Sequence, residues 1–183
     1  MKKEDVALWL KEGNQSKITP KIKEICSKFK GDDLEKIFQI LNWIDKNMHE
    51  EKDRKKVLKL FAIRTADQLV KDKNDTGCHD SALLVVTFLR AVGIPAKYLV
   101  GIDKIRPTRG GHCVAEAYVG NRWILIDPTY FKLNLIPSRS HFYNQNWIVK
   151  KGKDSWDCGI KTHKDWKRTS DNLVKRISKD LAR

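Results

Sequence analysis

Long apolar runs are absent from this chain of 183 residues. No stretch approaches the roughly 20 residues that a helix needs to cross a bilayer. Residues 1–10 carry acidic residues at positions 4 and 5, so we expect neither a membrane segment nor a secretory signal there. Internal repeats and low-complexity segments are also missing. With 40% hydrophobic and 9% aromatic residues, the composition excludes a disordered or fibrous chain and predicts one globular domain.

Cysteine is scarce, and its spacing is not typical of a metal site. The four cysteines lie 52, 35 and 45 residues apart, and none belongs to a C-x-x-C pair. This spacing argues against a structural zinc site and against a disulfide scaffold. The sequence also lacks a calcium loop of the D-x-D-x-D-G type. We therefore expect reduced thiols in a cytoplasmic protein that needs no metal or cofactor.

Acidic residues are outnumbered, 23 against 37 basic ones, so the formal net charge is +14. The excess is +4 over residues 1–75, +2 over 76–131 and +8 over 132–183. Most of the basic residues are Lys, which favours the interpretation of a solvated surface. The alternative is a polyanion-binding face in the last third, where Trp147, Trp156 and Trp166 alternate with basic residues. We expect these Trp side chains to pack on the core instead.

Helical and strand-like patterns occupy different parts of the chain. Residues 1–75 predict several short helices, one of which opens at Asp32 and Asp33. Residues 78–92 are apolar on nearly every side, which predicts a buried central helix that ends at Gly93. Strand-like runs follow at 96–102, 112–119, 122–127 and 146–150, and a terminal helix is predicted at 162–182. Helices followed by antiparallel strands predict an α+β fold.

Cys78 is the first candidate catalytic residue, because it opens the predicted central helix directly after Gly77. The free amides and the macrodipole at a helix N-terminus stabilise a thiolate and lower the pKa of the thiol. The same amides can donate hydrogen bonds to an oxyanion that forms beside the sulfur. The alternative is a small buried hydrophobic residue, which is what most free cysteines are.

His112 and Asp127 are the candidate partners of Cys78. A thiolate enzyme needs an imidazole as base and acid, and a third group that orients the imidazole. A two-residue hairpin turn at 120–121 would place Val119 opposite Arg122. His112 and Asp127 then become diagonal neighbours on one face of the hairpin. The alternative is that His112 is a surface histidine and Asp127 an unrelated aspartate at a strand end. That interpretation gives no reason for the two residues to share a face.

Cys113 and His79 are weaker candidates, because each is adjacent to a candidate residue in the sequence. Neighbouring residues on a strand face opposite sides, so we expect Cys113 to be packed away from His112. His79 should project about 100° away from Cys78 on the helix, which makes it a poor base. For the same reason we do not expect Cys78, His79, His112 and Cys113 to form a metal site.

Three segments in order resemble the motifs of the transglutaminase-like superfamily. Residues 76–82 (TGCHDSA) and 88–96 (FLRAVGIPA) resemble the first motif, in which a glycine-cysteine pair opens the central helix. Residues 112–119 (HCVAEAYV) look like the second, and 123–129 (WILIDPT) like the third. The resemblance implies a papain-like/transglutaminase-like core, with N-terminal helices and a central buried helix packed on an antiparallel β-sheet. It also implies one domain over 1–183, made of a helical part (1–75), a catalytic core (76–131) and a basic part (132–183).

The activity that the resemblance implies is thiol-dependent acyl transfer from an amide of a protein or peptide substrate. Cys78 would be the nucleophile, His112 the general base and acid, and Asp127 the orienting group. A peptidase or amidase is favoured over a cross-linking protein-glutamine gamma-glutamyltransferase. The reasons are that Val114 replaces a frequent aromatic of the family, which would thin the channel wall, and that positive surroundings should repel a lysine ammonium.

Several roles stay open at this stage. Trp43 and Gln68 are the upstream side chains that could add a second oxyanion donor, and we expect Trp43 to belong to the core instead. Asp80 is interpreted as structural, and Glu116 as a partnered acid rather than a cleft residue. The alternative function is a non-catalytic module on the same fold that binds polyanions through its basic last third. For the enzyme we expect at most a weak polyanion contact there and no membrane contact.

Overall fold

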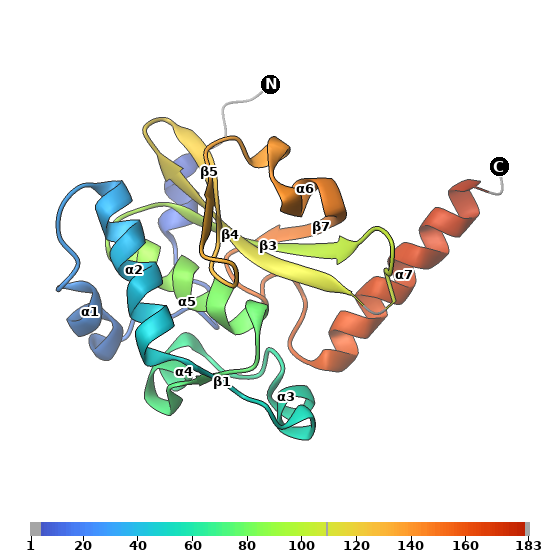
Figure 1. The fold of residues 1–183 in the computed structure, drawn as a ribbon, viewed down its shortest axis with the longest axis horizontal. Helices are drawn as coiled ribbons and strands as arrows, with labels where there is room; N and C mark the ends of the chain where they lie inside the picture. The colour runs from blue at the N-terminus through green and yellow to red at the C-terminus, as the bar shows by residue number, and fades with distance from the viewer. Residues whose placement is uncertain (1–4, 109, 182–183) are drawn as a thin grey trace.

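The computed structural model describes residues 5–108 and 110–181 (Figure 1). Its helices are α1 (Pro20–Cys26), α2 (Asp33–Asn47), α3 (Arg54–Leu60), α4 (Ala66–Asp72), α5 (Cys78–Ala91), α6 (His141–Gln145) and α7 (His163–Leu181), with 3-10 turns η1 (Val6–Leu10) and η2 (Pro137–Arg139). Its strands are β1 (His49–Glu50), β2 (Asn74–Asp75), β3 (Ala96–Asp103), β4 (Gly111–Val119), β5 (Arg122–Asp127), β6 (Lys132–Asn134) and β7 (Asn146–Gly152). The predicted α+β fold is confirmed.

Local capping explains where the N-terminal helices begin. The Asp32 side chain accepts a hydrogen bond from Glu35 N, and the Glu35 side chain accepts one from Asp32 N, so a capping box opens α2. Thr65 and Gln68 form the same arrangement at the start of α4. Each of these caps satisfies amides that have no partner within the helix.

The central helix α5 lies in the middle of the molecule and is buried along most of its length (Figure 1). Gly77 precedes it with a φ of +121°, a backbone conformation that favours glycine. At the other end Gly93 has a φ of +85° and follows the C-cap Val92, as the sequence predicts. The start of α5 is therefore fixed at Cys78.

Five strands form one antiparallel sheet in the order β6-β5-β4-β3-β7. The predicted hairpin between β4 and β5 is confirmed, with Val119 paired to Arg122. Gly120 and Asn121 both have positive φ, +55° and +62°, as a two-residue I′ turn requires. The same register extends along β4 and β5 and places His112 and Asp127 on the same face of the sheet.

The two faces of the sheet are covered differently. The large core lies between the sheet and α5, and Cys113, Ala115 and Ile126 face it. The other face carries a small cluster beneath α6, made of Leu99, Val114, Leu125 and Phe142. The alternation along β4 therefore places Cys113 on the α5 side and Val114 on the α6 side.

The structure corrects several sequence-based expectations. The strands β1, β2 and β6 and the helix α6 were not predicted, because two- to five-residue elements carry too little periodicity. The first full helix, α1, ends at Cys26. Leu34 and Phe38 are exposed, because α2 turns the face of Ile37 and Leu41 toward the core instead.

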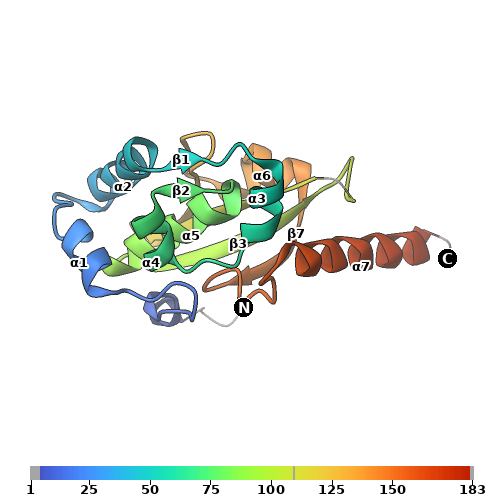
Figure 2. The same cartoon turned by 90° about the horizontal axis from the view of Figure 1, so that it is seen from below.

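The C-terminal helix α7 extends away from the body of the molecule in both views (Figures 1 and 2). It confirms the predicted terminal helix, except that Ala182 lies outside the described residues. Across residues 5–108 and 110–181, none of the helices is both long and apolar enough to cross a membrane.

Candidate active site

Cys78 is the first residue of α5 and sits where the helix start meets the sheet. The Asp75 side chain accepts a hydrogen bond from Gly77 N at 3.0 Å, which holds the turn into the helix. Amides in the first turn of a helix have no partner within it. The Cys78 amide is therefore placed to donate to an oxygen that develops negative charge beside the sulfur.

His112 lies between Cys78 and Asp127. Its Nε2 is 2.9 Å from Asp127 Oδ2, and its ring also lies near the Cys78 thiol, so that each group shifts the pKa of the other. Because Nε2 faces the carboxylate, Nδ1 is the nitrogen left for the sulfur. The structure thus brings together the three residues that the sequence singled out, in the order thiol, imidazole, carboxylate.

The electrostatics of this trio favour an ion pair. Hydrogen bonding from Cys113 and from the imidazole of His112 lowers the pKa of Cys78 well below the ordinary thiol value, against the opposing effect of burial. Burial alone would lower the pKa of His112, but its hydrogen bonds with Asp127 and Cys78 raise it to about 10. A thiolate beside an imidazolium is the state in which a cysteine is an effective nucleophile.

Cys113 and His79 approach Cys78 more closely than the sequence argument allowed. Cys113 is packed on the opposite face from His112, as expected. That face is the one that meets α5, so Cys113 lies near the Cys78 thiol and influences its pKa. His79, the next residue on α5, also influences the pKa of the thiol.

His79 is held in place by polar neighbours and by stacking. Its Nε2 is 3.0 Å from Thr76 Oγ1 and 3.5 Å from Asp80 Oδ1, and its ring centroid lies 4.0 Å from that of Phe61. Burial opposes the charged form, but Asp80 and Cys78 raise the pKa of His79 above its usual value. Both neighbours therefore favour the charged form of this ring, while burial opposes it.

Asp80 has the structural role that the sequence suggested. It is fully buried, and its Oδ2 accepts hydrogen bonds from Arg64 Nη2 at 2.9 Å, from Thr76 N at 2.9 Å and from Thr76 Oγ1 at 2.7 Å. Glu116 is likewise a buried, partnered acid, bound by Lys151 and Tyr143 on the α6 side of the sheet. Neither carboxylate lines a pocket beside Cys78.

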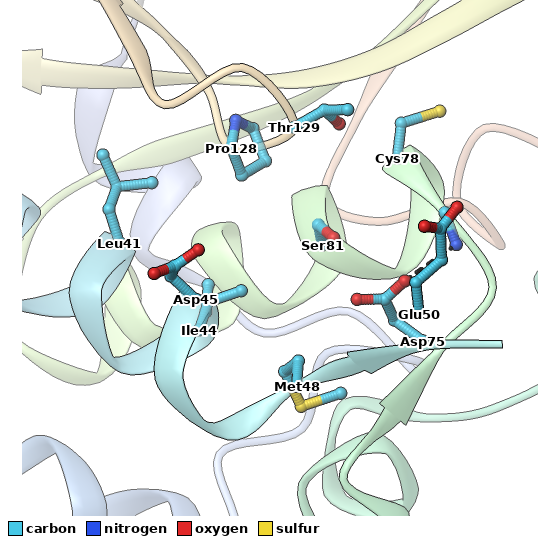
Figure 3. A pocket seen from close by; sticks show the side chains of 11 residues that line it. Leu41, Ile44, Asp45, Met48, Glu50, Asp75, Cys78, Ser81, Pro128 and Thr129 are labelled. Carbon is cyan, nitrogen blue, oxygen red and sulfur yellow. Dashed lines mark hydrogen bonds between the residues drawn. The ribbon is translucent and has the colours of Figure 1, made fainter.

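Two pockets flank the candidate residues. One, of about 310 Å³, is lined by Cys78, Gly77, Ser81, Pro128, Thr129 and residues of α2, β1 and β2 (Figure 3). The other, of about 440 Å³, is lined by His112, Asp127, Gly111, Tyr130 and Phe142 among others. An extended substrate that reaches the sulfur can therefore occupy space on both sides of it.

Val114 is not part of either pocket, which corrects one argument drawn from the sequence. It is fully buried in the cluster beneath α6, so it cannot form a channel wall. Trp166 of α7 comes closer to the site, because a Cβ on Gly111 would meet its ring at 2.2 Å. The sequence carried no signal that α7 returns to the residue before His112.

The candidate second oxyanion donors are occupied elsewhere. Trp43 is half-buried against the core, with its ring centroid 5.1 Å from that of Phe88, as expected. Gln68 is exposed and its Oε1 accepts from Thr65 N at 2.8 Å in the α4 cap. Within the described part of the chain, no cluster of three or more His, Cys, Asp or Glu side chains could hold a metal ion.

A comparison with known protein families identifies the family of the chain. The family model of the transglutaminase-like superfamily matches residues 21–128. Since that match covers more than half of the chain, the protein belongs to the transglutaminase-like superfamily, and the resemblance of the three motifs is confirmed. A comparison with curated protein sequences found no match.

A solved structure with a TM-score of 0.63 shows the same fold. A candidate cysteine protease from Cytophaga hutchinsonii is 22% identical with a TM-score of 0.63, over 86% of this chain and 50% of that one. A TGase is 16% identical, TM-score 0.46, over 67% and 35%. Legionella pneumophila LapG is 18% identical, TM-score 0.40, over 72% and 81%. This chain thus spans about half the length of the C. hutchinsonii protein.

Proposed function

We propose that this protein is a cysteine hydrolase of amide bonds, a peptidase or amidase, with Cys78, His112 and Asp127 as its catalytic triad. The observation that carries the proposal is the position of His112, which lies 2.9 Å from Asp127 Oδ2 and near enough to the Cys78 thiol, at the start of a buried helix, for the two groups to shift each other's pKa. The protease designation of the C. hutchinsonii structure supports the same class.

The chemistry follows from the positions of these groups. The Cys78 sulfur attacks the carbonyl carbon, and the new oxyanion accepts a hydrogen bond from the Cys78 amide. The imidazolium of His112 gives its proton to the leaving amine as the C–N bond breaks, which leaves a thioester. His112 then takes a proton from water, which attacks the thioester and releases Cys78 and the free acid. Asp127 keeps the ring oriented in both steps.

Transfer to an amine is the alternative fate of the thioester. Two arguments against it came from the sequence, namely a thin wall at Val114 and repulsion of ammonium groups. Val114 does not reach the site, and the pocket beside Cys78 is lined by carboxylates, so neither argument holds. The triad serves both fates of the thioester, so hydrolysis stays the proposal on the strength of the protease designation.

Isotope labelling tests the proposal. The wild-type protein is incubated with a mixed peptide library in water enriched in ¹⁸O, with and without a millimolar biotinylated primary amine. Hydrolysis of a thioester places one ¹⁸O in each new carboxylate, whereas transfer yields the biotinylated amide. We expect labelled carboxylates as the main product and none with Cys78→Ala, while Cys26→Ala behaves as wild type. Equal products from Cys78→Ala would contradict the proposal.

A further inference from the structure

The pocket beside Cys78 concentrates negative charge in a strongly basic protein. Asp45 of α2, Glu50 of β1 and Asp75 of β2 all line it, although the chain carries a net charge of +14. Across residues 5–108 and 110–181, none of these three carboxylates forms an ion pair. The charge of the pocket is therefore opposite to that of the molecule, and no ion pair within the described residues offsets it.

Glu50 and Asp75 are paired directly with each other. The two-residue strands β1 and β2 run parallel, and their register places Glu50 opposite Asp75. Like charges in this position repel. Burial and the nearby carboxylates of Asp80 and Glu50 raise the pKa of Asp75. Figure 3 shows the carboxylates of Glu50 and Asp75 side by side at one end of the pocket.

An unpartnered hydroxyl also faces this pocket. Ser81 lies on the first turns of α5, is nine-tenths buried and lines the pocket. Its hydroxyl makes no hydrogen bond with any residue that the structure describes. Figure 3 shows Ser81 between Asp45 on one side and Glu50 and Asp75 on the other. The hydroxyl borders the open space of the pocket, so it is available to a ligand there.

The remaining lining is apolar. Leu41, Ile44 and Met48 are buried core residues that also border the pocket, together with Pro128. The pocket is thus apolar between Asp45 on one side and the Glu50–Asp75 pair on the other. Such a surface suits a Lys or Arg side chain, which has an aliphatic stem and a cationic head. Such a head would be attracted by all three carboxylates and could donate to the Ser81 hydroxyl.

We propose that this pocket binds the cationic end of a lysine or arginine side chain of the substrate and thereby holds the reacting group at Cys78. The proposal rests on the proposed function, since it assigns specificity to the same thiol. Two sources share this chemistry: a basic residue next to the amide that is attacked, and the amine of an acceptor. In the ¹⁸O experiment, labelled carboxylates next to Lys or Arg indicate the first source, and biotinylated amides the second.

The charge selectivity of mixed-disulfide formation at Cys78 tests the proposal without any substrate. The rate of mixed-disulfide formation is measured with the cationic reagent 2-(trimethylammonium)ethyl methanethiosulfonate and with the anionic 2-sulfonatoethyl methanethiosulfonate. In both reactions the thiolate displaces methanesulfinate. The modified site is mapped by mass spectrometry, and each rate is divided by that of 2-mercaptoethanol. We expect the cation to react about tenfold or more faster than the anion at low ionic strength, and the ratio to shrink in salt.

Charge-neutral variants provide the control. In the triple variant Asp45→Asn, Glu50→Gln, Asp75→Asn the ratio should fall to about 1 or below. The single variant Glu50→Gln should lower it in part, whereas Asp180→Asn, an equal change of charge on the exposed end of α7, should leave it unchanged. If the three acids only stabilise the start of α5, the melting temperature should fall and the ratio stay the same, which would overturn the proposal.

The outcomes separate the two proposals. A reactive Cys78 with no preference for the cation, or a preference that survives the triple variant, overturns the charged pocket and leaves the proposed function standing. A Cys78 that reacts no faster than Cys26 with either reagent overturns the proposed function, and the pocket assignment with it.

Discussion

The same core surrounds two kinds of cysteine. Cys26 and Cys158 are packed among apolar side chains, and burial raises the pKa of each to about 12. Cys78 packs against this core too, yet its pKa is lowered, because Cys113, His112 and His79 all hydrogen-bond its sulfur. The difference predicts that a thiol buried among apolar side chains is inert, and that one at the meeting of a helix start with strand ends is reactive.

Among the variants that test this comparison, Asp127→Asn should have the largest effect on the turnover number. The amide can donate a hydrogen bond where the carboxylate only accepts, so His112 would be held in the wrong tautomer. We expect the turnover number to fall by about 10²- to 10⁴-fold, with a melting temperature close to that of the wild type. Steady-state kinetics on a peptide identified by ¹⁸O labelling, together with calorimetry, measure both. Near-full activity in this variant would remove Asp127 from the triad.

The alkaline limb of the pH profile should follow His112. Its pKa is raised to about 10, so the imidazolium persists well above the ordinary range of histidine and is lost as the pH rises through that value. Because the leaving amine needs this proton, kcat/KM should decline near pH 10 rather than near pH 6.5. A profile over pH 5–11 with a stable peptide tests this, and a decline centred near 6.5 would contradict it.

Substitution of Cys113 should have a smaller effect, because it changes the pKa of the Cys78 thiol and not the contacts with substrate. Its hydrogen bond is the largest cause of the low pKa of Cys78. In Cys113→Ala the apparent pKa for alkylation of Cys78 should rise, and the rate at pH 6 should fall several-fold. Cys113→Ser keeps a hydroxyl that can donate and should restore most of the rate. Cys158→Ala is the matched control, since it removes a buried thiol away from Cys78.

Much of the site could be predicted from the sequence because it depends on local rules. A glycine before an apolar helix placed Cys78, and one hairpin turn fixed the register that aligns His112 with Asp127. The surroundings of the thiol could not be predicted in this way. The acidic pocket depends on β1 and β2, which are two residues each and lie 25 residues apart in the chain. The approach of Trp166 to Gly111 depends on tertiary packing of α7.

The net charge of the chain did not predict the charge of the pocket beside Cys78, for a related reason. The excess of basic residues describes the whole surface, with +14 over the chain, but the field at a pocket depends on the few groups that line it. At Cys78 these groups are carboxylates from three separate elements. A polyanion contact through the basic last third stays a prediction. Its Trp side chains are partly accounted for, since Trp156 Nε1 donates to Ala62 O at 2.7 Å and Trp166 packs against the core.

The most direct test of the difference between the cysteines is alkylation with iodoacetamide, mapped for all four thiols by mass spectrometry from pH 5 to 10. The lowered pKa of Cys78 and the raised pKa of Cys26, Cys113 and Cys158 predict that Cys78 alone is modified at pH 6 in the native protein. Its rate should change little up to pH 9, because the thiolate is already formed. Equal modification of the four thiols at pH 6, or a Cys78 rate that rises with an apparent pKa near the free-thiol value of about 8.5, would contradict the account.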